Sequence, residues 1–180
     1  MIKTEKFIEI SKKLGLHFTN IDILIKAFTH RSYLNEHRHS GIEHNERLEF
    51  LGDAVLELVV TDFLYTEYPK KPEGEMTALR SALVNAQTLS EVALQLGLNE
   101  YLLLSKGEAK DTGRARQYIL ANTIEALIGA VYLDQGYDAA KVFIGKHVHS
   151  LLDDIINQKK FIDAKSKFQE LAQEHVGATP

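Results

Sequence analysis

Three acidic residues, Glu46, Glu49 and Asp53, are spaced for one face of a helix in the segment of residues 45–60, NERLEFLGDAVLELVV. At 100° per residue, their side chains fall within about 60° of one another. Like charges at this spacing repel and slightly destabilise an isolated helix. A hard divalent cation would offset the repulsion, and the alternative is a solvated acidic face on an ordinary amphipathic helix.

A second segment, residues 118–134, reads YILANTIEALIGAVYLD and is strongly apolar. Asn122 and Glu125, three residues apart, lie on one face of the predicted helix, and Gly129 continues that face. A carboxylate on so apolar a helix is expected to be partly buried, which is costly unless it is paired. This helix alone is compatible with a buried hydrogen-bonded pair or with part of a metal site.

The apolar periodicity is helical along almost the whole chain, so we predict an all-α fold without internal repeats. We expect helices at residues 2–14, 21–28, 44–65, 75–96, 117–134 and 138–157, the second with Asn20 as its N-cap. The segments 35–43 and 105–113 are polar, contain glycine and are expected to be loops. In the 44–65 helix, the residues expected to face the core are Leu48, Leu51, Val55, Leu58 and Val59.

The composition sets broad limits. A chain of 180 residues is long enough for one domain with a substantial core. It contains no Cys, which excludes disulfides and Cys-ligated zinc and suits the reducing cytoplasm, where we expect the protein. No apolar run of about 18 residues occurs, so no membrane partner is expected. The net charge of −4 argues mildly against a nucleic-acid partner unless several of the acids bind cations.

The segment of residues 45–56, NERLEFLGDAVL, resembles the signature of the ribonuclease III family, which are double-stranded-RNA endonucleases. The resemblance covers about residues 5–157 and implies a catalytic domain at 1–157, a helical bundle that forms a two-fold dimer. Residues 163–171, DAKSKFQEL, resemble the start of a double-stranded-RNA-binding domain. We therefore expect a linker at 158–163 and, at 164–180, the first helix of that domain, cut short at Pro180.

The resemblance also implies the site residues. The matching family positions hold catalytic Mg²⁺, for which Mn²⁺ can substitute, and these positions are Glu49, Asp53, Asn122 and Glu125. Asp53 and Glu125 would be catalytic, with Glu46 and Glu73 assisting metal binding or strand positioning. The third position is most often Asp in the family. Asn122 removes one negative charge there, and an amide oxygen can still bind Mg²⁺.

Two further roles follow from the same resemblance. Arg114 and Arg116, in a Gly-Arg-x-Arg segment, would contact RNA phosphates, with a solvated basic turn as the alternative. Phe50 lies beside the acidic face, outside the apolar arc, and matches a family Phe that packs into a socket on the partner of a homodimer. His30 is expected to be a hydrogen-bonded structural residue.

The function that these expectations imply is a metal-dependent endoribonuclease acting on double-stranded RNA in RNA processing, leaving 5′-phosphate ends and short 3′ overhangs. The alternative is a ribonuclease III-like domain with weakened catalysis that serves as an RNA-binding or structural subunit, and Asn122 is its best support. A third class, a helical carboxylate protein using its metal for redox chemistry, lacks the required pair of Glu-x-x-His motifs on core helices.

Overall fold

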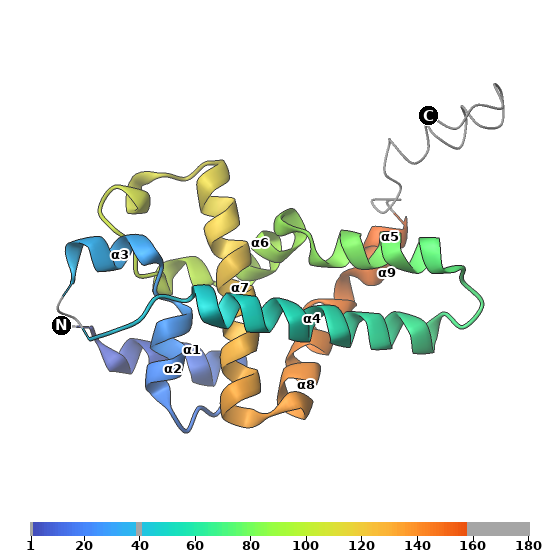
Figure 1. Ribbon diagram of the computed structural model, residues 1–180, viewed down its shortest axis with the longest axis horizontal. Helices are drawn as coiled ribbons and strands as arrows, with labels where there is room; N and C mark the ends of the chain where they lie inside the picture. Colours follow the sequence, from blue (N-terminus) through green and yellow to red (C-terminus); the bar gives the residue numbers. More distant parts are fainter. Residues whose placement is uncertain (1, 39–40, 158–180) are drawn as a thin grey trace.

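The computed structural model describes residues 2–38 and 41–157, and its regular elements in these ranges are helical (Figure 1). The longest two, α4 (Glu46–Glu67) and α7 (Arg114–Gln135), have 22 residues each and cross near the centre of the fold. The other α-helices are α1 (Thr4–Leu14), α2 (Ile21–Ala27), α3 (Arg31–Glu36), α5 (Glu73–Val84), α6 (Ala86–Gln95), α8 (Tyr137–His147) and α9 (Leu152–Asn157). Three 3₁₀ turns join them: η1 (Leu98–Tyr101), η2 (Glu108–Lys110) and η3 (His149–Leu151). The predicted all-α fold is confirmed.

Helix α7 is the central helix of the bundle. It packs against α2, α4, α6 and α8, and Ile124, Leu127 and Val131 are fully buried within these contacts. A helix that is apolar on nearly every side has to lie inside a fold. Polar side chains in the middle of α7 therefore have mainly apolar surroundings, except where a neighbouring helix contributes polar groups of its own.

The helix predicted for residues 75–96 is two helices, because the chain breaks at Asn85. This residue has an extended backbone (φ −71°, ψ 158°), and its Oδ1 accepts a hydrogen bond from the Thr88 N–H at 2.9 Å, which caps α6. The apolar period continues through the break, so the periodicity did not reveal it. The helix predicted for 138–157 likewise ends at His147 and resumes at Leu152 after η3.

Leu58 was expected in the core, and this prediction was wrong. Its side chain is 57% exposed, whereas Leu56 and Val60 are fully buried. The reason is that α4 crosses α7 at Gly52. The buried face of α4 is therefore centred nearer to Leu56 than the predicted core-facing residues of this helix indicated. Leu58 instead points outward with Tyr65 further along α4.

Among the described residues, no helix combines the length and the apolarity needed to cross a bilayer. The linker predicted at 158–163 and the helix predicted at 164–180 lie outside the described residues.

Candidate active site

The crossing of α4 and α7 depends on two glycines, Gly52 and Gly129. A Cβ atom on Gly52 would lie 1.8 Å from the backbone oxygen of Glu125, and one on Gly129 would lie 2.3 Å from the backbone oxygen of Leu48. Both distances are far below van der Waals contact. The two backbones therefore touch, and glycine is the residue that permits this approach.

Because the backbones touch, four side chains with oxygen atoms come together: Glu49 and Asp53 on α4, and Asn122 and Glu125 on α7. The Asn122 amide donates a hydrogen bond to the Glu49 carboxylate. Asp53 is exposed and lies close enough to Glu49 and Glu125 for its negative charge to raise the pKa of both. The structure thus places the four predicted metal-binding residues in one cluster, which we call the acidic cluster.

Within the acidic cluster, Glu125 has the most strongly raised pKa. Burial, followed by the negative charges of Asp53, Glu49 and Glu57, raises the pKa of Glu125 to about 8. Burial also raises the pKa of Glu49, and the charge of Glu46 adds to the effect. At neutral pH without a cation, Glu125 is therefore mostly protonated.

This pKa predicts a dependence of stability on pH. Between about pH 4.5 and pH 8, the folded protein holds a proton on Glu125 that the unfolded chain has lost, so the free energy of unfolding should fall as the pH rises through this range. Above about pH 8 both states are ionised and this contribution stays constant. Melting curves in EDTA from pH 4.5 to pH 8.5 test the effect, and Glu125→Gln should flatten the slope. An equal slope in that variant would contradict the assignment.

The donor set of the acidic cluster fits a hard divalent cation in its chemistry. Three carboxylates and one amide oxygen are ligands that Mg²⁺ and Mn²⁺ accept, and a cation would relieve the repulsion that raises the pKa of Glu125. In their present orientations, however, the Asp, Glu and His side chains of residues 2–38 and 41–157 include no group of three or more arranged to hold a metal ion.

Glu46 lies at the outer edge of the acidic cluster. It is the first residue of α4, is exposed, and its carboxylate pairs with Arg31, with Nη1 to Oε1 at 3.3 Å. Its charge contributes to the raised pKa of Glu49. The structure therefore brings Glu46 near the predicted ligands without placing it among them.

Glu73 does not join the acidic cluster within one chain. It is the first residue of α5, and it accepts a hydrogen bond from Thr77 Oγ1 at 2.8 Å. It lies in the wall of a small pocket of about 160 Å³ beside the far end of α4, which we call the α4–α5 pocket. This pocket is lined by Thr61, Leu64, Tyr65, Glu73, Met76, Thr77 and Arg80. Thr61 is eight residues from Asp53, about 12 Å along the helix axis.

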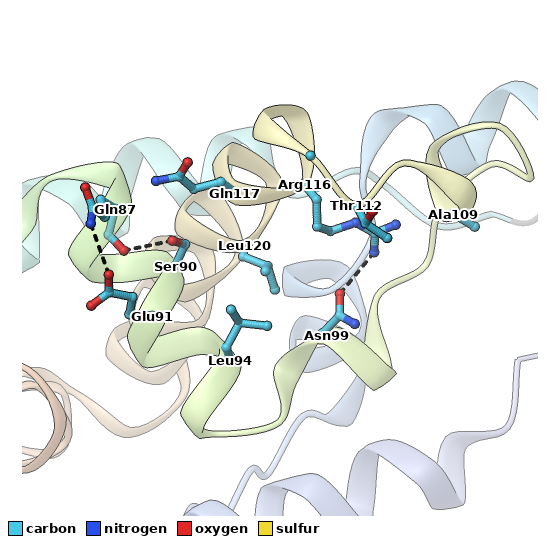
Figure 2. A pocket seen from close by; sticks show the side chains of 11 residues that line it. Gln87, Ser90, Glu91, Leu94, Asn99, Ala109, Thr112, Arg116, Gln117 and Leu120 are labelled. Carbon is cyan, nitrogen blue, oxygen red and sulfur yellow. Dashed lines mark hydrogen bonds between the residues drawn. The ribbon is translucent and has the colours of Figure 1, made fainter.

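Arg116 was predicted to contact RNA, and the structure assigns its side chain to the protein itself. The guanidinium donates to the backbone oxygens of Asp111 and Glu108 at 3.2 and 2.7 Å. It also donates to Asn99 Oδ1 at 3.1 Å, the bond that Figure 2 shows for Arg116. These bonds close the 105–113 loop over the start of α7. Arg116 therefore has a structural role in this loop, and its contact with RNA stays a prediction.

A pocket of about 630 Å³ borders Arg116 and lies between α6 and α7 (Figure 2). Leu120 lines it, and on α7 this residue points about 140–160° away from Asn122 and Glu125. The pocket is thus on the opposite side of α7 from the acidic cluster and takes no part in its chemistry.

Comparison with known proteins agrees with this arrangement. Residues 20–152 match the family model described as Ribonuclease-III-like. Ribonuclease 3 of Geobacillus sp. (strain WCH70) is 49% identical over 168 residues, which cover 93% of this chain and 68% of the relative. Ribonuclease 3 of Carboxydothermus hydrogenoformans is 48% identical over 169 residues, covering 94% and 72%. This chain belongs to the ribonuclease III family.

A solved structure shares the fold of this ribonuclease III domain. The nuclease domain of ribonuclease III from Campylobacter jejuni superposes with a TM-score of 0.71 at 36% identity, covering 79% of this chain and 95% of that one. That nuclease domain is reported to have structural flexibility in the region involved in dimer formation. The match to the family model and the similarity to the two ribonuclease 3 relatives show that this chain is a ribonuclease III-type endonuclease.

One positioning residue of this ribonuclease III domain was not recognised from the sequence. Asn45 is 2% exposed, and its Nδ2 donates to the backbone oxygen of Ala27 at 3.2 Å while its N–H donates to that of Thr29 at 2.9 Å. The start of α4 is thereby tied to the end of α2. The residue type gave no indication of this role, because both acceptors are backbone oxygens of another segment.

His30 has the structural role that was expected. Its Nδ1 accepts a hydrogen bond from the Ser32 N–H at 3.3 Å and lies 2.8 Å from Ser32 Oγ, which caps α3. Burial lowers the pKa of His30, so the imidazole is neutral at physiological pH.

Proposed function

We propose that this ribonuclease III is a divalent-metal-dependent endoribonuclease that hydrolyses phosphodiester bonds in double-stranded RNA, leaving 5′-phosphate ends and short 3′ overhangs. The observation that supports this most strongly is the acidic cluster, in which touching backbones hold Glu49, Asp53 and Glu125 together despite their repulsion. Mg²⁺ is the proposed cation, with Mn²⁺ able to replace it. The chain has no cysteine, which suits action in the reducing cytoplasm.

The residues of the acidic cluster would have different roles in this reaction. Bound Mg²⁺ would lower the pKa of a water molecule and stabilise charge on the phosphate and the leaving oxygen. Glu49, Asp53, Glu125 and the amide oxygen of Asn122 would hold the cation. Glu125 would give up its proton as the positive charge lowers its pKa. Asn122, which donates to Glu49, would keep that carboxylate turned toward α7.

A cleavage assay tests this function. A long RNA duplex and its separate single strands are incubated with the protein in Mg²⁺ or in EDTA. We expect cleavage of the duplex in Mg²⁺, none in EDTA, and products with 5′-phosphates. Duplex binding without cleavage in Mg²⁺ and in Mn²⁺ would contradict the proposal and favour a ribonuclease III-like RNA-binding subunit, for which Asn122 is the supporting observation.

Asn122→Asp tests how the amide contributes. In EDTA, Asp loses the amide donor and adds a charge beside Glu49, so the free energy of unfolding should fall by roughly 1–3 kcal/mol. In Mg²⁺ the added carboxylate should lower the concentration needed for half-maximal cleavage, with a rate equal to or above that of the unmutated protein. Mg²⁺ titration of the rate and a melting curve measure both effects. Unchanged or weaker Mg²⁺ dependence would contradict a ligand role.

Helix α4 also carries an exposed apolar stripe, which we define as Phe50, Ala54, Leu58, Thr61 and Tyr65. Phe50, Leu58 and Tyr65 are 81%, 57% and 72% exposed. Leu58 is about 12 Å from Phe50 and about 10 Å from Tyr65 along the axis, so it lies near the middle of the stripe. Two antiparallel α4 helices related by a two-fold axis at Leu58 would place Phe50 of each copy opposite Tyr65 of the other.

This homodimer would account for the α4–α5 pocket and for the position of Glu73 away from the acidic cluster of its own chain. The α4–α5 pocket, with Leu64, Tyr65 and Met76 in its wall, would receive Phe50 of the second copy. Glu73 lies in the same wall and would come close to the second copy's Glu49, the residue next to its Phe50. Each acidic cluster would then be completed by the partner's Glu73, along one valley wide enough for a duplex.

Phe50→Ala should therefore dissociate the dimer. Two sites are lost per dimer, each at a cost on the order of 3–5 kcal/mol if the ring is fully buried in the pocket. Sedimentation at micromolar concentration measures the change, with Val142→Ala as the control, because Val142 is 71% exposed on α8, outside the stripe. A monomeric unmutated protein, or a dimer unaffected by Phe50→Ala, would rule out this interface.

A further inference from the structure

Two residues continue the face of the acidic cluster toward the start of α7. Arg114 and Tyr118 precede Asn122 by eight and four residues, and with Glu125 all four fall within an arc of about 80°. Arg114 is exposed, and Tyr118 is 47% exposed. A duplex bound over the acidic cluster along α7 would pass over both side chains.

These two side chains contact each other. Arg114 Nη2 donates to the Tyr118 hydroxyl at 3.3 Å, and the Arg114 guanidinium carbon lies 5.7 Å from the centre of the Tyr118 ring. The contact restricts a long side chain that otherwise has many rotamers, and it uses one of five N–H donors. Arg116, in contrast, has two bonds to its own loop and one to Asn99 of η1. Of this arginine pair, Arg114 therefore keeps four N–H donors for a phosphate when bonds to the described residues are counted, whereas Arg116 keeps two and is held to the protein by the other three.

We propose that Tyr118 is a substrate-positioning residue, whose ring and hydroxyl hold the Arg114 guanidinium against a backbone phosphate of duplex RNA. Arg114 precedes Glu125 by 11 residues, which places this contact about 16 Å along α7 from the acidic cluster. The ligand is a phosphate of the strand, so the contact contributes affinity and register without reading the base sequence. The inference rests on the proposed function, since it requires that duplex RNA binds at the cluster.

Binding measurements with the full chain test the inference. The affinity for a duplex RNA is measured against salt concentration in a Glu125→Gln protein, which prevents cleavage, alone and with Arg114→Ala, Tyr118→Ala or both. Arg114→Ala should weaken binding roughly three- to tenfold and reduce the salt slope by about one. Tyr118→Ala should cause most of the same loss, and the double variant should lose no more than Arg114→Ala alone. Tyr118→Phe keeps the ring and should recover most of the affinity.

The matched control is Lys6→Ala. Lys6 is also a cation that lies over an aromatic ring, with its Nζ 4.8 Å from the centre of Tyr101, but it is on α1, away from the acidic cluster. It should leave affinity and salt slope unchanged, and melting temperatures of the surface variants should agree within about 2 °C. Normal affinity in Tyr118→Ala, losses that add in the double variant, or a Tyr118→Phe protein as weak as Tyr118→Ala would overturn the inference. Absence of both duplex cleavage by the unmutated protein and duplex binding by Glu125→Gln would instead overturn the proposed function, and the inference with it.

Discussion

Replacing Glu125 with glutamine is expected to reduce cleavage of duplex RNA at least about a hundredfold while leaving the fold and duplex binding intact. Residues that only orient metal ligands cost 10–100-fold when they are replaced, so loss of a ligand should cost more. Glutamine keeps the side-chain volume and removes the charge. Because the pKa of Glu125 is raised from 4.5 to about 8, a neutral side chain should also stabilise the cation-free protein, by an amount that grows from about pH 4.5 and is constant above about pH 8.

Single-turnover cleavage at saturating enzyme separates this loss from a change in binding. Glu91→Gln is the matched control, because Glu91 lines the pocket on the opposite side of α7 and its replacement removes the same charge. We expect that control to cleave normally. A Glu125→Gln rate within about twofold of the unmutated protein would exclude Glu125 from the chemistry.

Gly52→Ala should have the largest effect on the fold. The added Cβ would lie 1.8 Å from the oxygen and 2.6 Å from the carbonyl carbon of Glu125, and 2.8 Å from the Gly129 nitrogen. These are backbone atoms, so no side-chain rotation relieves the contact and the two helices must separate. We expect a loss of at least about 3 kcal/mol in the free energy of unfolding. Cleavage should fall about a hundredfold in the protein that still folds, because catalytic groups would be displaced by about 1 Å.

Denaturant unfolding measures the change in stability, and Gly74→Ala is its control. Gly74 is in α5, and no neighbouring atom lies within 4 Å of a Cβ built there. Because alanine favours helix more than glycine does, the control should be unchanged or more stable by up to about 1 kcal/mol. A Gly52→Ala protein as stable as the unmutated one would show that α4 and α7 do not touch at this residue.

Much of the fold follows from local sequence patterns. The long helices α4 and α7 were predicted because their apolar residues repeat at the helical period, and Asn20 was predicted as an N-cap, which its Oδ1 confirms by accepting from the Asp22 N–H at 3.0 Å. The break at Asn85 was missed because the apolar period runs through it. The exposure of Leu58 was missed because the direction of a helix face depends on where the next helix crosses it.

The candidate site was predictable only in part. Spacing indicated which oxygen-bearing side chains share a face on each helix, but their meeting depends on the contact between Gly52 and Gly129, which spacing does not reveal. An isolated glycine inside a long helical pattern was the available signal. The bonds that Arg116 makes within the protein were not predicted, because two of its three acceptors are backbone carbonyls, which the residue types do not indicate. The position of Glu73 depends on how α5 packs along α4, a tertiary feature.

The central claim is that the crossing of α4 and α7 holds the catalytic cation, and the location of Mn²⁺ tests it most directly. Anomalous scattering from crystals of the protein soaked in Mn²⁺ gives the position of the ion. We predict a peak about 2.0–2.5 Å from carboxylate oxygens of Glu49, Asp53 and Glu125. A protein that cleaves duplex RNA in Mn²⁺ and shows its Mn²⁺ peak away from these three residues would contradict the account.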